Sequence, residues 1–322
     1  MAKQRGIQLI SGLMIFLSFL TGCFFKSELN VDPLDPQYFP SYTISAGDTA
    51  TPFQAVSNTP MVKPPTSTTT PTFTPTATDT PLPTDTPAPT PTPAWVSLPA
   101  GHVQAPILLY HHISNDGYGN RYYVSVDDFR AQMETLRNLG YTAITITNLA
   151  EVLLNGGELP PRPVVITFDD GNLDVYENAF PIMRELGLVG TNYIVANRLE
   201  AKNFINPDQL REMGDAGWEL GSHSMDHTDL TTDYSIANYE IRQSMLVLEE
   251  ATGEPVSTFA YPYGKTDEFV STKVSQYGYR AGMGLGLGTD HYQGTLFYLS
   301  RIEIQGDYDL SRFATLLPWS DQ

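Results

Sequence analysis

The chain has 322 residues and a formal net charge of −18. Most of the acidic excess lies between residues 106 and 322, where 30 Asp and Glu stand against 14 Lys and Arg. Such a surface repels phosphate backbones, so nucleic acid is not expected as a partner, and a neutral or cationic substrate fits better. The charge serves solubility equally well and says little about the reaction. The single cysteine, Cys23, excludes an intramolecular disulfide.

The N-terminal residues have the pattern of a secretory signal. Two basic residues precede an apolar stretch at residues 7–20, which is short for a membrane span. The sequence LTGC at residues 20–23 resembles the lipobox of bacterial lipoproteins, in which the chain is cut before the cysteine and the cysteine is lipidated. We therefore expect a signal peptide at residues 1–22 and a cell-surface lipoprotein anchored in the membrane through lipidated Cys23. An ordinary cleaved signal with a chance cysteine is the alternative.

A segment rich in proline and threonine follows. Residues 64–93 contain 10 Pro and 13 Thr. Proline at this density prevents helices and sheet ladders and favours an extended spacer. Residues 27–63 also lack sustained periodicity. We expect residues 23–100 to form a disordered linker and residues 101–322 to form one catalytic domain.

From about residue 105, apolar runs alternate with amphipathic segments. Strands are expected at residues 106–110, 142–146, 163–168, 191–195, 218–221, 257–261, 279–283 and 299–304. Helices are expected at residues 126–139, 149–154, 173–186 with a break at Pro181, 207–216, 235–252, 267–277 and 309–316. Strands regularly separated by helices imply a parallel sheet, and this many of them predict an α/β fold of the deformed (β/α) barrel type.

Polar residues follow three of these strands. Asp169 and Asp170 come directly after one strand, His223 comes after a second, and Tyr263 comes after a third. Because the carboxyl ends of parallel strands gather on one face of a barrel, we expect these residues to lie together. One carboxylate and two neutral imidazoles can hold a divalent ion, and the second carboxylate can then activate water.

Each of these motifs also has an ordinary structural interpretation. Asp-Asp-Gly at residues 169–171 is a turn signal by itself, and His223 and His227 could be a surface pair. Their four-residue separation predicts that both imidazoles lie on one side of a helical turn. The combination of the two motifs, rather than either alone, indicates a metal site.

Three segments carry a resemblance to a known family. The sequences TFDDG at residues 167–171, HSMDH at 223–227 and FAYPYG at 259–264 resemble the polysaccharide deacetylase family with the NodB homology domain, carbohydrate esterase family 4. PILLYHHIS at residues 106–114 resembles the start of that domain in the branch that includes poly-N-acetylglucosamine deacetylases. The resemblance extends over residues 106–316.

The resemblance implies a set of roles. Asp169 would be the general base, and Asp170, His223 and His227 would bind a divalent metal, with zinc expected. The backbone N–H of Tyr263 would complete the oxyanion site. The implied activity is removal of N-acetyl groups from a cell-surface or extracellular N-acetylglucosamine-containing polysaccharide. A non-catalytic glycan-binding lipoprotein, an O-acetyl xylan esterase and an inert structural lipoprotein are the alternatives.

Two departures from the family pattern leave roles open. The family has an arginine that pairs with the base where this chain has Ala260, so Arg280 and Arg301 are the candidates to supply the missing charge. Arg301 is preferred because it interrupts an otherwise strand-like run, although a surface salt bridge would also explain it.

The general acid is the second open role. No Leu-x-x-His sequence occurs near the C-terminus, which leaves His291 as the only late histidine and the candidate proton donor. His111 and His112 close the first strand on the predicted face, where one of them could line the pocket or pack in the core.

Overall fold

The computed structural model describes residues 94–320. The predicted signal peptide, Cys23 and nearly all of the predicted linker lie outside these residues. Between residues 94 and 320, no helix has both the length and the apolar character needed to cross a membrane.

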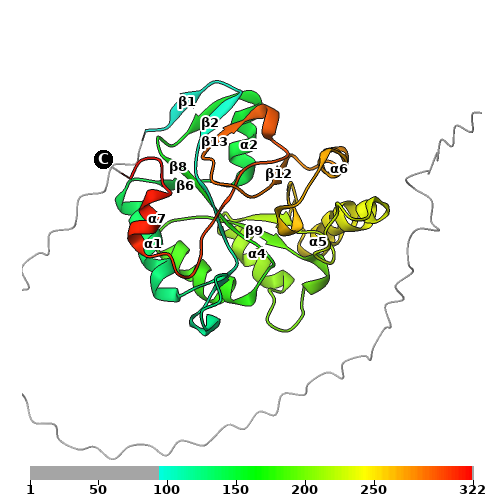
Figure 1. Ribbon diagram of the computed structural model, residues 1–322, viewed down its shortest axis with the longest axis horizontal. Coiled ribbons are helices and arrows are strands. Elements are labelled where there is room, and N and C mark those ends of the chain that lie inside the picture. The colour runs from blue at the N-terminus through cyan, green and yellow to red at the C-terminus, as the bar shows by residue number, and fades with distance from the viewer. Residues whose placement is uncertain (1–93, 321–322) are drawn as a thin grey trace, which may run out of the picture. The chain divides into compact units, whose positions relative to one another are not determined.

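A curled parallel sheet forms the centre of the domain (Figure 1). Its strands are β3 (Ile107–Tyr110), β6 (Thr142–Ala143), β8 (Pro163–Phe168), β9 (Thr191–Ile194), β10 (Glu219–Ser222), β11 (Thr258–Ala260), β12 (Ala281–Met283) and β14 (Ile302–Glu303). They run in the order β12, β11, β10, β9, β8, β3, β14, and β6 pairs with β8 beside this path. All of these pairs are parallel.

The two edges of the sheet come together just before β14. Met283, the last residue of β12, forms a parallel bridge with Leu299, and the Gly284 N–H donates to the Leu299 carbonyl. The run from Leu299 into β14 therefore lies between β12 and β3. The predicted α/β fold with a deformed (β/α) barrel is confirmed.

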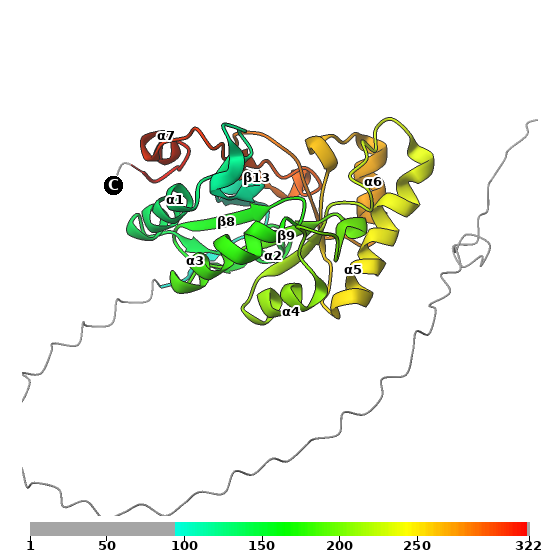
Figure 2. The ribbon, with the colours of Figure 1, turned by 90° about the horizontal axis from the view of Figure 1, so that it is seen from below.

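Helices surround this sheet (Figures 1 and 2). The α-helices are α1 (Val126–Asn138), α2 (Ile146–Asn155), α3 (Phe180–Glu185), α4 (Pro207–Asp215), α5 (Ser244–Thr252), α6 (Glu268–Gln276) and α7 (Leu310–Thr315). Two π-helices, η3 (Val175–Ala179) and η6 (Asn238–Gln243), lead directly into α3 and α5. The 3-10 helices are η2 (Asn115–Gly117), η4 (Ala196–Arg198), η5 (Tyr234–Ile236), η7 (Pro262–Gly264) and η8 (Gln293–Thr295).

Local sequence signals explain several helix starts. The Ser125 hydroxyl accepts the Asp128 N–H at the start of α1, and Asn206 forms a capping box with Gln209 before Pro207 at the start of α4. The predicted break at Pro181 appears as the change from η3 to α3, with the proline in the first turn of α3.

The strands are buried on both faces, which explains their continuous apolar runs. Leu108 and Ile166 pack in one cluster with residues of α1, α3 and α4, whereas Ile107, Val165 and Tyr193 belong to a second cluster with residues of α2. Alternate residues of one strand thus serve different clusters, as the period of two requires.

Three short two-stranded sheets were not predicted. Strand β1 (Val96–Leu98) pairs with β7 (Gly157–Leu159), β2 (His102–Gln104) with β13 (Asp290–Tyr292), and β4 (His112–Ile113) with β5 (Tyr123–Val124). Strands of two or three residues carry too little periodicity to be recognised in sequence. Because β1 is paired, the folded region begins before the predicted domain boundary at residue 101.

Candidate active site and metal centre

The carboxyl ends of β3, β8, β10 and β11 meet around one cleft. Its volume is about 400 Å³. The lining residues are Leu109, His111, His112, Asn120, Arg121, Tyr122, Tyr123, Asp169, Asp170, His223, His227, Tyr263, Gly264, Leu285, Arg301 and Glu303. They include the Asp169–Asp170 pair after β8, His223 after β10 and Tyr263 after β11, which the strand order brings to one face as expected.

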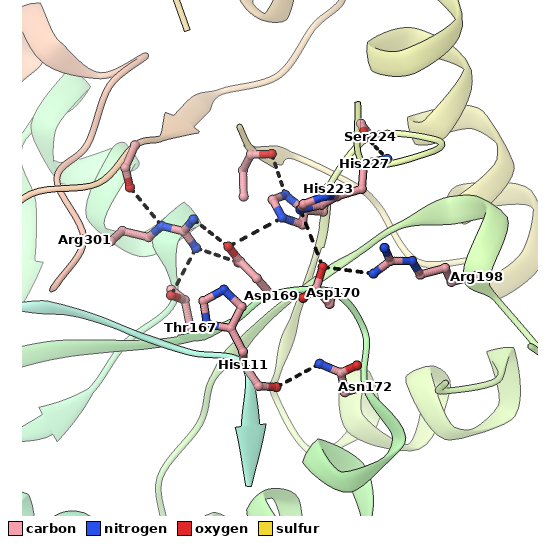
Figure 3. Close-up of polar contacts among 12 residues, drawn as sticks. His111, Thr167, Asp169, Asp170, Asn172, Arg198, His223, Ser224, His227 and Arg301 are labelled. Atoms are coloured by element: carbon pink, nitrogen blue, oxygen red, sulfur yellow. Dashed lines mark hydrogen bonds and ion pairs between the residues drawn. The ribbon is translucent and has the colours of Figure 1, made fainter. Parts of the chain in front are cut away.

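Three of these side chains form a set that fits a metal ion. Asp170, His223 and His227 each offer one ligand atom, and these atoms lie within 4.8 Å of one another (Figure 3). Nδ1 of His223 lies 2.8 Å from the Ala260 carbonyl oxygen, so an Nδ1–H donated there leaves Nε2 free as a ligand. Two imidazoles and one carboxylate are a donor set that zinc accepts, with open positions remaining.

The charge state of His227 suits this arrangement. Burial and the neighbouring His223 imidazole lower the pKa of His227 to about 4. The imidazole is therefore neutral near pH 7, which is the form that binds a metal.

The loop that carries both histidines is not helical, so the prediction of a helical turn is wrong. Ser224 and His227 have positive φ angles of 68° and 61°. The Ser224 hydroxyl accepts the His227 N–H at 2.9 Å, and the imidazole centroids of His223 and His227 lie 4.8 Å apart. Two left-handed residues, rather than helical periodicity, turn the chain so that both rings face the cleft.

Asp169 and Arg301 form a buried bidentate ion pair (Figure 3). The guanidinium Nη atoms lie 2.7 and 2.8 Å from the two carboxylate oxygens. Arg301 is 1% exposed and Asp169 is 3% exposed. Burial alone would raise the pKa of Asp169, but the Arg301 charge, with a contribution from His223, lowers it to about 2. Asp169 is therefore ionised at neutral pH, and Arg301 supplies positive charge where Ala260 offers none.

The second arginine candidate lies elsewhere. Arg280 pairs with Glu151 of α2 and is not among the residues that line the cleft. The interruption of an apolar run by Arg301 was thus the more informative sequence signal, because a fully buried guanidinium requires a partner.

A further arginine contacts one of the proposed metal ligands and was missed from sequence. Nη1 of Arg198 lies 3.1 Å from Oδ1 of Asp170, and its guanidinium stacks over the Phe204 ring. Arg198 closes η4, directly after β9. The sequence feature that could have identified Arg198 is its position just after a predicted strand.

The structure places the two histidines that end the first strand at the cleft. His111 lines the cleft, and its Nδ1 is buried and has no hydrogen-bond partner among residues 94–320. Burial lowers the pKa of His111, although Asp169 and Asp170 act in the opposite direction. His112 also reaches the cleft, but its Nδ1 is engaged by Asp174 at 2.7 Å.

His291 does not reach the cleft. It lies in β13, which pairs with β2, and its Nε2 is 3.0 Å from the Ala105 carbonyl oxygen. Because this short strand is paired, the imidazole is held in the interior at 1% exposure. The structure therefore gives no support to His291 as the general acid.

Tyr263 lies at the rim of the cleft with 58% of its surface exposed. Its φ of 60° places it in a tight turn within η7, and its ring meets the His227 ring at a centroid distance of 4.5 Å. The turn brings the backbone after β11 close to the proposed metal ligands.

Comparisons with known proteins agree with this geometry. Residues 156–282 match the family model described as polysaccharide deacetylase. YxkH of Bacillus subtilis is 26% identical over 213 residues, which cover 66% of this chain and 75% of that protein. The poly-beta-1,6-N-acetyl-D-glucosamine N-deacetylase of Staphylococcus epidermidis is 28% identical over 177 residues, which cover 49% of this chain and 61% of that enzyme.

A solved structure shares the fold as well as the sequence pattern. The polysaccharide deacetylase BC0361 from Bacillus cereus superimposes with a TM-score of 0.60 at 27% identity, covering 67% of this chain and 69% of that one. Together with the curled parallel sheet and the site at its carboxyl end, these matches support a polysaccharide deacetylase domain of the NodB type, a hydrolase that acts on amide bonds.

Proposed function

We propose that the protein removes N-acetyl groups from an extracellular polysaccharide containing N-acetylglucosamine, by metal-assisted hydrolysis. One observation carries the proposal. The ligand atoms of Asp170, His223 and His227 converge within 4.8 Å, and the ionised carboxylate of Asp169 lies beside them, 3.6 Å from Nε2 of His223. A ligand set and a separate base are the two parts that metal-assisted hydrolysis requires.

The metal would be held by Asp170, His223 and His227. A zinc ion bound there would polarise the acetamide carbonyl and lower the pKa of the attacking water. The Ala260 carbonyl fixes the His223 ring, and Arg198 fixes the Asp170 carboxylate, so these two ligands are oriented by their neighbours.

The remaining steps belong to side chains of the cleft. Asp169 accepts the proton of the water that attacks the acetamide carbon, while the Tyr263 N–H donates to the developing oxyanion. The C–N bond then breaks, and the leaving amine takes a proton through His111, which the proton taken up by Asp169 resupplies. The products are acetate and a glycan with a free amine.

Arg301 makes Asp169 suitable for this role. Without a cation, burial would favour the protonated acid, which cannot act as a base. The bidentate contact keeps the carboxylate ionised and fixes its orientation toward the cleft.

The walls of the cleft favour a sugar substrate. The Tyr122 ring is tilted against the His111 ring at a centroid distance of 4.8 Å, and Tyr263 also lines the cleft. Aromatic faces pack against the apolar faces of pyranose rings, and Asn120 and Arg121 can donate hydrogen bonds to hydroxyls. The name of the Staphylococcus epidermidis relative supports poly-β-1,6-N-acetylglucosamine as the first substrate to test.

The site of action would be the cell surface. The signal-like N-terminus, LTGC at residues 20–23 and the proline- and threonine-rich stretch that follows support a lipoprotein anchored through Cys23. Labelling of the full-length protein with a radioactive fatty acid, lost in Cys23→Ala, tests this part of the proposal. Equal labelling of both proteins would refute it.

The purified full-length protein should bind about one equivalent of zinc and release acetate from an N-acetylglucosamine polymer. Four substrates distinguish the possibilities: poly-β-1,6-N-acetylglucosamine, chitin oligomers, peptidoglycan and O-acetylated xylan. Zinc without acetate release from any of them would favour glycan binding without turnover, and release from xylan alone would favour the esterase. Absence of bound metal after incubation with zinc would contradict the proposed chemistry.

A further inference from the structure

The loop that carries the two metal-ligand histidines adopts a backbone that it would not favour alone. It begins with His223, directly after β10, and both Ser224 and His227 have left-handed backbone angles that are unfavourable for residues other than glycine. Such a conformation persists only where the surroundings fix it. The surroundings of this loop therefore determine how far apart the two imidazoles lie.

Glu240 is the charged residue that fixes the middle of this loop. Its Oε2 accepts the Met225 N–H at 3.1 Å and the Asp226 N–H at 3.0 Å. Glu240 is 3% exposed, and no Lys, Arg or His forms an ion pair with it among residues 94–320. The two backbone N–H groups are therefore the main compensation for burying this carboxylate.

The element that carries Glu240 is attached to the strand that ends at His223. Glu240 lies in the π-helix η6, and the Ser244 hydroxyl, at the start of α5, lies 2.8 Å from the Glu240 carbonyl oxygen. The same hydroxyl lies 2.7 Å from the Ser222 hydroxyl, in the last residue of β10. These hydrogen bonds connect η6, which carries the Glu240 carboxylate, to the end of the strand that precedes the loop. π-helical turns of this kind are frequent at functional sites.

We propose that Glu240 is a positioning residue for the metal centre. By binding two consecutive N–H groups between the histidines, its carboxylate sets the separation of the His223 and His227 rings and so the affinity for the metal. The inference rests on the proposed function, because it assigns Glu240 a role in that metal site. It predicts an effect on metal affinity that is separate from any effect on stability.

The test compares two glutamates near opposite ends of β10, of which Glu240 is buried and Glu219 is partly buried. Glu240→Gln removes the charge beside the loop, whereas Glu219→Gln removes the charge of a carboxylate at the start of β10 that accepts the Thr147 N–H at 2.8 Å. Zinc affinity of each full-length protein is measured by competition with a chromophoric chelator. We expect the zinc Kd to rise at least about 10-fold in Glu240→Gln and to stay within about 2-fold in Glu219→Gln.

Two further measurements separate positioning from general stability. In the metal-free protein, Glu240→Gln should lose hydrogen-exchange protection at Met225 and Asp226, and with zinc in excess its kcat should return to within a few-fold of wild type. A wild-type zinc Kd combined with a lowered Tm would overturn the proposal, because the contact would then be only structural. If Glu240→Gln does not fold, Glu240→Asp decides by the same criterion, since it keeps the charge but shortens the reach.

Failure of the proposed function gives a different result. A wild-type protein that binds no zinc refutes the metal centre, and hydrogen exchange then decides the role of Glu240 in the loop. Selective loss of protection at Met225 and Asp226 in Glu240→Gln would support that role, and unchanged protection would overturn it.

Discussion

The two ends of the barrel shift the pKa of an acidic side chain in opposite directions. At the carboxyl end, Asp169 faces a cleft and is paired with Arg301, which lowers its pKa. At the amino end, Glu219 accepts the Thr147 N–H and the Thr258 hydroxyl, and burial raises its pKa. The comparison shows that the Arg301 cation reverses the effect of burial on the pKa of Asp169, whereas the hydrogen bonds to Glu219 do not reverse it there.

This contrast indicates that the acid at the carboxyl end of the barrel takes part in the reaction, whereas the acid at the amino end has a structural role. A carboxylate kept ionised beside the proposed metal site can accept a proton, whereas a carboxyl group held by neutral donors mainly joins neighbouring elements. Four predictions test the contrast, in decreasing order of expected effect.

Replacing Asp169 should have the largest effect. Asp169→Asn keeps the size of the side chain but cannot accept a proton, so kcat should fall on the order of 10³-fold while bound zinc stays near one equivalent. Acetate release and metal analysis on the same sample check this. Glu219→Gln, at the other end, should keep kcat within about 2-fold. Comparable losses in both variants would remove the distinction between the ends.

Replacing Arg301 should affect both activity and stability. Arg301→Met leaves Asp169 buried without a cation, so the free energy of unfolding should fall by about 3 kcal/mol and kcat/KM by on the order of 10². Arg301→Lys should be intermediate, because an ammonium keeps the charge but not the bidentate geometry. Denaturant unfolding and acetate release measure the two effects. Unchanged turnover in Arg301→Met would show that the ion pair serves stability alone.

Replacing His111 tests the proton donor. His111→Gln should lower kcat on the order of 10²-fold with zinc content unchanged, since the leaving amine would lack its acid. The neighbouring His112→Gln is the matched control and should lose no more than a few-fold, because His112 is engaged by Asp174. If a substrate with a better leaving group reacts as slowly as the amide in His111→Gln, proton donation is not the role of His111.

The pH dependence of stability should have opposite signs for the two acids. The pKa of Asp169 is lowered to about 2, so its stabilising contribution, about 2 kcal/mol, is present above pH 4 and is lost as pH falls toward 2. The pKa of Glu219 is raised, so its contribution is present below the unfolded pKa and is lost as pH rises through the folded pKa.

Urea unfolding of the metal-free protein between pH 2 and 7 measures both contributions. The stability difference between wild type and Asp169→Asn should shrink on acidification. Glu219→Gln should gain stability relative to wild type as pH rises, because the amide carries no charge to bury. The same sign for both variants would contradict the contrast.

The sequence was sufficient to predict the barrel and the face on which the site lies. Strand periodicity placed Asp169, Asp170 and His223 at strand ends, and parallel topology then required them to converge. An arginine within the apolar run that leads into β14 likewise indicated a buried partner. Both inferences depend on the local pattern of apolar residues and on the rule that the carboxyl ends of parallel strands gather on one face of a barrel.

Contacts between distant elements could not be predicted in the same way. Arg198 and Glu240 act through particular backbone and side-chain distances that no local periodicity specifies. The spacing of His223 and His227 suggested a helix because a separation of four residues fits helical geometry, whereas two left-handed residues produce the same proximity. His291 was misplaced because the pairing of β13 with β2 depends on chain segments far apart.

The pairing of Asp169 with Arg301 also has a consequence for the order in which the molecule is completed. The two residues are separated by 132 positions, and the run that carries Arg301 is also the one that bridges β12 and β3. A nascent chain therefore contains all three proposed metal ligands well before the cation of the base has been synthesised. Arrival of the last strand would close the sheet, bury Asp169 and pair it with its cation in one event.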